Sequence, residues 1–318
     1  MLPAKEPPRA RRHFQCSARR TCAVASLAIS LLLALGAIAG DAAAAWLSRA
    51  FFRGSAAGAV AAITFPQAPL PKHALCVLAT FKNEALNLRE WLEHYAWAGV
   101  DALLLLDNGS TDAWRAEVAG FENFATVLAA PAVHAQEENY NDFGRPWLLA
   151  RGCEFVAVLD LDEFAFATPA RSLRAAVVDA FTHAGAGVSQ LLCPWLMFGS
   201  SGRVAHPVGG VRTNFTLRAA APHELTKAFV RLGDLGRFHI HSHDVTGATA
   251  PCPPTIRLNH YAIQSREYFE RVKMTRGDAA AEMYEGRRNA AYFKSYDFAE
   301  ERDETLRDLV LGAQAAKS

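Results

Sequence analysis

Two acidic residues at the end of an apolar run are the strongest chemical signal in the sequence. Residues 155–166 read FVAVLDLDEFAF, and the apolar stretch ends in Asp160, Leu161 and Asp162. The density of Val and Leu predicts a buried strand of a parallel sheet, and such sheets bind ligands at the carboxyl ends of their strands. Two aspartates at i and i+2 share a face if the strand continues, and such a pair suits a hard divalent cation. The alternative is a pair of ordinary solvated turn residues.

Two further polar segments are expected at the same edge of the sheet. Thr80 to Glu84 closes a first apolar strand at 74–80, and Asp107 begins an Asn-Gly-Ser-Thr-Asp turn after a second strand at 101–106. A carboxylate such as that of Asp107 can accept a hydrogen bond from the N3–H of a uracil ring, and a turn of free N–H groups can hold a ribose or a phosphate. Each segment alone is routine, but three on one edge indicate a binding site.

Strand and helix signals alternate from residue 73 onward and indicate the fold class. The expected strands span 74–80, 101–106, 125–130, 155–160 and 188–195. The expected helices span 84–97, 143–152, 172–181, 266–275 and 300–311. One more helix is expected after Asp107, with Ser110 or Thr111 as its N-cap. This order predicts an α/β domain with a doubly wound sheet.

The N-terminal region has the features of a membrane anchor. Residues 21–40 carry no charge and are rich in Leu, Ala and Ile, and their length is about that of a transmembrane helix. The excess of basic residues before them predicts a cytosolic tail at 1–20. The residues after the anchor are then expected on the opposite side of the membrane. A cleavable signal peptide is the alternative. Residues 41–72, rich in Ala and Gly and then in Pro, indicate a stem before a folded domain at 73–318.

Charge and cysteine content narrow the class of protein. The chain has 318 residues and a formal net charge of +1, so nothing in its balance indicates a nucleic-acid partner. The cysteines that follow the anchor are Cys76, Cys153, Cys193 and Cys252. They allow three pairings, between which the sequence does not choose. Because three of them lie in apolar strand-like runs, where free buried cysteine is common, at most one disulfide is expected.

Four segments of the domain resemble the family-92 glycosyltransferases. They are FKNEALNLREWLEHYAWAGVDALLLLDNGSTD at 81–112, VLDLDEF at 158–164, CPWLMFGSSG at 193–202 and LNHYAIQSREYFERVKMTRG at 258–277. Because that family is related to the family-2 glycosyltransferases, the resemblance implies a mixed sheet of the GT-A type. It also implies an inverting transferase that uses manganese or magnesium and moves a hexose, galactose above all, from a UDP-sugar donor to a glycan acceptor. The usual setting of the animal members is the Golgi lumen, behind a single-pass type II anchor.

The resemblance assigns roles to individual residues. Asp160 and Asp162 match the DxD pair that bridges a metal ion to the diphosphate, where the metal neutralises charge on the departing UDP. Lys227 matches a basic position near the phosphates or the acceptor, with a solvated surface lysine as the alternative. The positions that line the nucleoside pocket are matched by Thr80, Glu84 and Asp107.

Histidines supply the remaining candidate metal ligands. His239, His241 and His243 alternate along the chain, and in a strand their side chains would share one face. No Cys or acid pattern of a zinc site accompanies them. A late histidine often adds a metal ligand in GT-A folds, so the resemblance makes His241 and His260 candidates. An ordinary hydrogen-bonded histidine is the alternative for each.

Two further residues complete the predicted site. Trp195, ahead of the Gly-Ser-Ser-Gly stretch at 199–202, is a candidate for stacking on the acceptor sugar, with a place in the core as the alternative. An inverting transfer also needs a general base. Glu224 is the candidate among the acids downstream of the DxD, which include Asp234 and Asp244.

Two other classes of function stay open. A phosphatase of the haloacid-dehalogenase type also carries a DxD after a strand, but that strand is normally the first, and its motif has Thr or Val where Phe164 stands. The second alternative is a catalytically silent, membrane-anchored carbohydrate-binding protein on the same fold. Such a protein has no need of the intact Asp107, Asp160 and Asp162.

Overall fold

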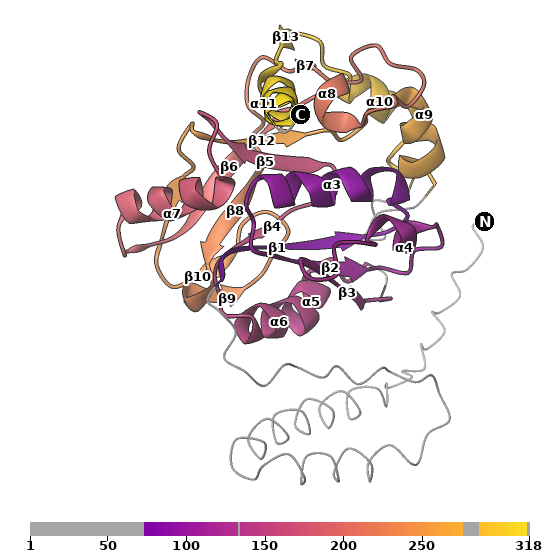
Figure 1. Cartoon of the computed structure of the whole chain (residues 1–318). Coiled ribbons are helices and arrows are strands. Elements are labelled where there is room, and N and C mark those ends of the chain that lie inside the picture. The colour runs from indigo at the N-terminus through magenta and orange to yellow at the C-terminus, as the bar shows by residue number, and fades with distance from the viewer. Residues whose placement is uncertain (1–72, 133, 276–285, 317–318) are drawn as a thin grey trace, which may run out of the picture. The chain divides into compact units, whose positions relative to one another are not determined.

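The computed structural model describes residues 73–132, 134–275 and 286–316, which are drawn in colour in Figure 1. The predicted cytosolic tail at 1–20, anchor at 21–40 and stem at 41–72 lie outside these residues. Within the described ranges, no helix combines the length and the apolar character needed to cross a membrane.

The described residues contain one mixed sheet of nine strands. These are β1 (His73–Phe81), β2 (Ala102–Asp107), β3 (Ala125–Ala129), β4 (Cys153–Val158), β5 (Glu163–Ala167), β6 (Val188–Met197), β8 (Thr226–Arg231), β11 (Ala248–Pro251) and β12 (Ile256–His260). Their order is β3-β2-β1-β4-β8-β6-β12-β5, with β11 beside β6. β1 to β4 run parallel, whereas β8 is antiparallel to both β4 and β6. The predicted α/β class is therefore confirmed, with a parallel half and a mixed half.

Helices cover both faces of the parallel half, because its strands are apolar on both sides. Leu75 and Val77 of β1 lie in one core together with side chains of α3 (Ala85–Trp97) and α7 (Leu173–Ala184). Cys76 lies in a second core that includes α6 (Arg145–Ala150). In Figure 1, α3 lies above β1 and β2, and α6 lies below them. This half of the sheet thus has the expected doubly wound arrangement.

The helix before the acidic pair begins earlier than predicted. Instead of 143–152, it consists of α5 (Gln136–Asn139), a π-helical turn at Tyr140–Gly144, and α6. The irregular middle breaks the 3.6-residue period on which the prediction relied. The helices predicted at 84–97 and 172–181 are confirmed as α3 and α7.

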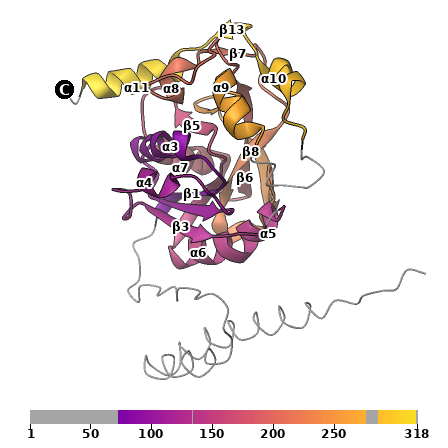
Figure 2. The same cartoon turned by 90° about the vertical axis from the view of Figure 1, so that its right-hand side faces the viewer.

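The remaining helices, turns and strands lie outside the nine-stranded sheet, and most of them are short. They are α4 (Trp114–Glu117), α8 (Val211–Asn214), β7 (Leu217–Arg218), a 3-10 turn at Leu232–Asp234, β9 (Leu235–Arg237), β10 (Asp244–Val245), α9 (Arg266–Tyr268), a π-helical turn at Phe269–Lys273, α10 (Ala290–Tyr296), β13 (Glu301–Arg302) and α11 (Thr305–Ala315). Figure 2 shows α8 and α11 packed side by side. The helix predicted at 266–275 is confirmed as α9 with its π-helical turn, whereas the helix predicted at 300–311 begins later, at α11.

Two disulfides link the described cysteines, Cys76 to Cys153 and Cys193 to Cys252. The first joins the neighbouring strands β1 and β4, and the second joins β6 to the residue after β11. Their Cα atoms are 6.0 and 4.8 Å apart, within the usual range for a disulfide. The expectation of at most one disulfide is therefore wrong. Strand pairing, which the sequence does not reveal, brings the two cysteines of each pair together.

Candidate functional site

Three loops leave neighbouring strands at one edge of the sheet. Phe81 pairs with Asp107 across β1 and β2, and Leu78 pairs with Val158 across β1 and β4. Because these strands are parallel, their carboxyl ends lie side by side. The segments that leave this edge are 82–84, 108–112 and 159–162. The structure thus brings together the three segments that were predicted to share an edge.

The first two loops are fastened to each other by hydrogen bonds. The Asn83 side chain accepts from the main-chain N–H of Thr111 at 2.7 Å, and the Ser110 hydroxyl accepts from the N–H of Asn83 at 2.9 Å. Asn83 has a φ of +54°, a conformation that Asn adopts more readily than most residues. Asp107 accepts from the N–H of Ser110 at 2.8 Å. Ser110 and Thr111 therefore shape the turn, and their prediction as helix caps is wrong, since α4 has no side-chain cap.

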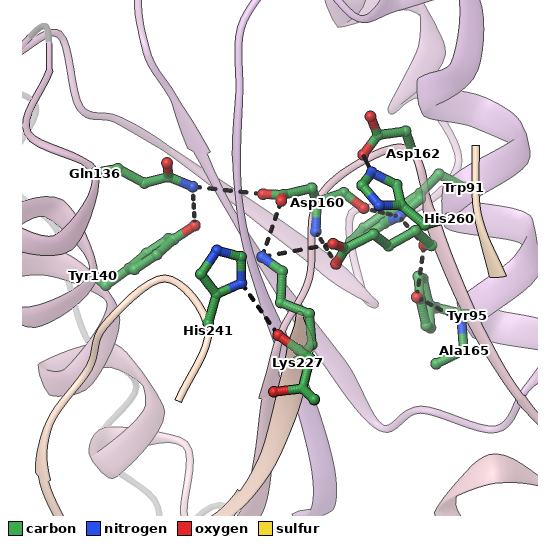
Figure 3. Close-up of polar contacts among 12 residues, drawn as sticks. Trp91, Tyr95, Gln136, Tyr140, Asp160, Asp162, Ala165, Lys227, His241 and His260 are labelled. Atoms are coloured by element: carbon green, nitrogen blue, oxygen red, sulfur yellow. Dashed lines mark hydrogen bonds and ion pairs between the residues drawn. The ribbon is translucent and has the colours of Figure 1, made fainter. Parts of the chain in front are cut away.

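The acidic pair lies in a turn and not in a strand. β4 ends at Val158, and Asp160 and Asp162 precede β5. The Glu163 N–H donates to the main-chain oxygen of Asp160 at 3.0 Å, and the Glu163 carboxylate accepts from the Asp160 N–H at 3.0 Å. The continuing strand that would place both aspartates on one face is therefore not present. Figure 3 shows the two carboxylates directed at different partners.

Two aromatic side chains of α3 hold this turn in place. Trp91 Nε1 donates to the main-chain oxygens of Asp160 at 3.0 Å and Glu163 at 3.1 Å. The Tyr95 hydroxyl donates to the main-chain oxygen of Glu163 at 2.9 Å and accepts from the N–H of Ala165 at 3.1 Å. Both residues lie in the helix predicted at 84–97, and the sequence analysis gave neither of them a role in the site. Their polar atoms were the available signal, because a buried Trp or Tyr usually finds a hydrogen-bond partner.

Asp160 is paired with Lys227 of β8. Lys227 Nζ lies 2.9 Å from Asp160 Oδ2 and 3.7 Å from Glu163 Oε1, and the lysine side chain is 1% exposed. Burial raises the pKa of Asp160, but Lys227 outweighs this effect and holds the pKa below its ordinary value. The alternative of a solvated surface lysine is therefore wrong. The role of Lys227 toward a phosphate stays a prediction.

Asp162 is paired with a second buried lysine. Lys273, the last residue of its π-helical turn, has Nζ 2.5 Å from Asp162 Oδ2 and is likewise 1% exposed. Burial opposes ionisation of Asp162, but Lys273 and then His260 hold its pKa well below the ordinary value. Sequence reasoning did not single out Lys273. The one signal for Lys273 in the sequence was its position in the segment at 258–277, which resembles the family-92 glycosyltransferases.

Glu84 belongs to the same network. The Tyr268 hydroxyl donates to Glu84 Oε2 at 2.6 Å, and Lys273 Nζ lies 3.8 Å from Glu84 Oε1. Glu84, Thr80 and Asp107 are 2%, 7% and 9% exposed, so all three are buried at the sheet edge. Their contact with a nucleoside stays a prediction.

Glu163 is a fully buried acid to which the sequence analysis gave no role. Its side chain is 0% exposed, and its carboxylate accepts the hydrogen bond from the Asp160 N–H described above. Burial raises its pKa well above the ordinary value, against the opposing effect of Lys227. Glu163 therefore supports the turn from inside the protein.

The three alternating histidines face different directions, because 238–243 is a loop and not a strand. His239 pairs with acids of α5 and β10. His241 donates from Nδ1 to the main-chain oxygen of Thr226 at 3.2 Å, and His243 is buried. The extended backbone that a shared face would require is therefore not present at 238–243. His241 lies beside Lys227 in Figure 3, and its role as a metal ligand stays a prediction.

His260 is the candidate histidine that reaches the acidic pair. Its Nε2 lies 3.5 Å from Asp162 Oδ1, and its side chain is 11% exposed. Its Nδ1 is buried and has no hydrogen-bond partner among the described residues. The ring centroid lies 4.3 Å from that of Trp195.

Trp195 is buried and also borders the candidate site. It is 7% exposed and packs against the rings of His260 and His241. Its place in the core is therefore confirmed, and its stacking on a sugar stays a prediction. Glu224 is exposed just before β8, and nothing in the described structure tests its role as a base.

The donor types near the acidic pair fit a manganese or magnesium ion. Asp160 and Asp162 offer hard carboxylate oxygens, and His260 adds an imidazole nitrogen with one buried, unpartnered atom. The Asp160 side chain is 32% exposed, so a ligand can reach it. However, no three His, Cys, Asp or Glu side chains within the described ranges are arranged to hold a metal ion. The types of donor atom therefore fit such an ion, and Asp160 and Asp162 are each paired with a different lysine.

Comparison with known proteins finds curated relatives that share one family name. No family model matches the chain. A glycosyltransferase family 92 protein of Oryza sativa subsp. japonica is 28% identical over 237 residues, which cover 69% of this chain and 39% of the relative. A family 92 protein of Ricinus communis is 28% identical, and the match covers 62% of this chain and 37% of the relative. A family 92 protein of Arabidopsis thaliana is 25% identical, and the match covers 63% of this chain and 37% of the relative. The resemblance to this family is confirmed, and the chain spans about two-fifths of the length of these relatives.

Several solved structures are also similar to the chain. Residues 1–349 of S. aureus TarS give a TM-score of 0.37 at 14% identity, with 68% of each chain covered. Glucosyl-3-phosphoglycerate synthase from Mycobacterium tuberculosis, in complex with Mn²⁺, UDP and glucosyl-3-phosphoglycerate, gives 0.29 at 15% identity, with 51% of this chain and 58% of that chain covered.

Proposed function

We propose that this chain is a glycosyltransferase of family 92 that moves a hexose, galactose for preference, from a UDP-sugar to a glycan acceptor with inversion. One observation carries the proposal. The loops at 82–84, 108–112 and 159–162 leave one edge of parallel strands, where open α/β sheets bind their ligands. The names of the curated relatives supply the reaction class. We also propose that residues 73–318 form a domain of the GT-A type.

The donor would lie across this edge. Asp107 would accept from the uracil ring, and the turn that begins there would hold the ribose. Asp160, Asp162 and His260 would hold a manganese or magnesium ion, which supplies positive charge against the charge that develops on the departing diphosphate. Trp91, through its hydrogen bonds with the turn, fixes where the two carboxylates stand.

The acceptor would approach from the side of Trp195. This indole borders His260 and thus the acidic pair, and an aromatic face suits the apolar face of a hexose. Glu224 would remove the proton of the acceptor hydroxyl in a single displacement, for which its exposure leaves it accessible.

The proposal includes a place in the secretory pathway. Residues 21–40 would anchor the protein as a single-pass type II membrane protein, with the domain at 73–318 in the Golgi lumen. The two disulfides support this setting, because disulfides persist in oxidising compartments.

The test measures UDP release by the full chain purified in detergent. UDP-galactose, UDP-glucose and UDP-N-acetyl sugars are each supplied with manganese or with EDTA. We expect release from one donor that requires the metal and is lost in Asp162→Ala, while Asp308→Ala on the exposed side of α11 retains it. Absence of release, together with absence of stabilisation by UDP and manganese, would rule the proposal out.

A silent carbohydrate-binding protein is the second candidate, because each acid of the pair is already neutralised by a lysine. Stabilisation by UDP and manganese without release, across a panel of glycan acceptors, would favour it. Release of inorganic phosphate from simple phosphate esters would instead indicate the phosphatase alternative.

A further inference from the structure

Each acid of the 160–162 pair has its own buried lysine. Lys227 reaches Asp160 at 2.9 Å from β8, and Lys273 reaches Asp162 at 2.5 Å from the π-helical turn after α9. Both lysine side chains are 1% exposed. An ammonium group shielded from water to this degree needs a carboxylate partner, and removal of that partner leaves an uncompensated buried charge.

The two ion pairs engage the two carboxylates separately. Lys227 and Lys273 come from separate elements, and each takes the Oδ2 atom of a different aspartate. The described residues contain no gathered set of three metal-binding side chains, although the donor types are suitable. A cation placed between the aspartates would also lie near two ammonium groups and be repelled by them.

The charges of the cluster indicate what could overcome that repulsion. Asp160 and Asp162 balance Lys227 and Lys273, and two further acids lie close, Glu84 at 3.8 Å from Lys273 and Glu163 at 3.7 Å from Lys227. A divalent cation alone adds two positive charges to this buried cluster. The diphosphate of a sugar nucleotide carries about one negative charge on each phosphate. The cation and the diphosphate together therefore add almost no net charge to the cluster.

We propose that Lys227 and Lys273 make the acidic pair bind a metal ion only together with a nucleoside diphosphate, whose phosphate oxygens replace the carboxylates as partners of the two lysines. This inference rests on the proposed function and deepens it. Lys273 is thereby assigned as a positioning residue, since it also contacts Glu84 at the end of β1 and so links the nucleoside side of the edge to the acidic pair.

The test measures manganese binding without turnover. Free Mn²⁺ is followed by electron paramagnetic resonance in titrations of the full chain in detergent, with and without UDP. In the parent protein we expect UDP to tighten Mn²⁺ binding by about tenfold or more, within the usual range of coupling between two ligands. In Lys273→Met and Lys227→Met, Mn²⁺ alone should bind more tightly and the effect of UDP should fall to about threefold or less. Lys294→Met, an exposed lysine of α10, should match the parent.

Lys273→Arg keeps the positive charge and should keep the coupling, which covers the case in which a Met variant fails to fold. Equal Mn²⁺ affinity with and without UDP in the parent protein would overturn the inference and leave the proposed function standing. Coupling that is unchanged in both Met variants would have the same effect. Absence of any UDP binding would overturn the inference and the proposed function together.

Discussion

Trp91 donates its indole N–H to the main-chain oxygen of Asp160 at 3.0 Å, although 69 residues of sequence separate them. The same N–H reaches the main-chain oxygen of Glu163 at 3.1 Å. One buried side chain of α3 thus holds both ends of the acidic turn. The position of the candidate metal ligands therefore depends on a helix that carries none of them.

Trp91→Phe keeps most of the ring volume but removes this donor. We expect a loss of about 1–2 kcal/mol in the free energy of unfolding, since two buried carbonyl groups lose a partner. Binding of UDP with manganese should also weaken. Urea unfolding and a UDP titration measure the two effects. Trp147→Phe on α6 is the control, because Trp147 lies in the core on the other face of the sheet and should leave UDP binding unchanged.

Asp160→Asn and Asp162→Asn keep the shape of each side chain and remove its charge. Each should lower UDP release by about 100-fold or more, the usual effect of losing one electrostatic contact to a departing group. Each also removes the nearest counter-ion of a buried lysine, so stability should fall as well. Initial rates and melting temperatures are measured side by side with Asp308→Asn. Release at the parent rate in Asp162→Asn would contradict the assignment of the DxD.

Removal of the Cys76–Cys153 disulfide tests the link between β1 and β4. The bridge closes a segment with a sequence separation of 77 residues. The double variant Cys76→Ala, Cys153→Ala should lose about 2–4 kcal/mol of unfolding free energy. Urea midpoints of the parent protein under reducing conditions should shift toward those of the variant. An unchanged midpoint in both experiments would show that the bridge does not contribute to stability.

His94 should make stability fall in acid. It is 0% exposed and donates from Nε2 to the main-chain oxygen of Ala165 at 2.8 Å. Burial, followed by the charge of Arg212, lowers its pKa from 6.5 to about 3. The folded state therefore keeps His94 neutral, while the unfolded chain takes up a proton below about pH 6.5. Its contribution is complete above that pH and is lost as the pH falls toward 3, by up to about 1.4 kcal/mol per pH unit.

His94→Gln retains a donor for Ala165 and has no group that titrates in this range. The plot of unfolding free energy against pH should therefore be flatter between about pH 6 and pH 4. Some slope should remain, because burial also lowers the pKa of His243 to about 3. The exposed His183 of α7 supplies the control, and His183→Gln should leave the slope of the parent protein unchanged.

The parallel half of the fold could be predicted from the sequence because its signals are local. The apolar runs before Thr80, Asp107 and Asp160 end where the strands end or within two residues, and parallel pairing then places these ends on one edge. The alternation of His239 and His243 was less informative, because alternation places side chains on one face only where the backbone is extended, and these residues lie in a loop.

The partners of the acids could not be predicted, because they come from distant parts of the chain. Lys227 and Lys273 lie 67 and 111 residues from the aspartates they contact. No periodicity or spacing links residues at such separations, and neither lysine differs locally from a surface lysine. The two disulfides escaped prediction for the same reason, with separations of 77 and 59 residues.

The place of β8 in the sheet has a consequence for the order of assembly. β8 lies between β4 and β6, both of which precede it in the chain. During synthesis, β4 and β6 therefore remain open edges until residues 226–231 have left the ribosome and inserted between them. Lys227 arrives with that strand, so the acidic turn gains this counter-ion only when β8 has joined the sheet. Until then the nascent chain carries unpaired strand edges, which are sites of aggregation and of chaperone binding.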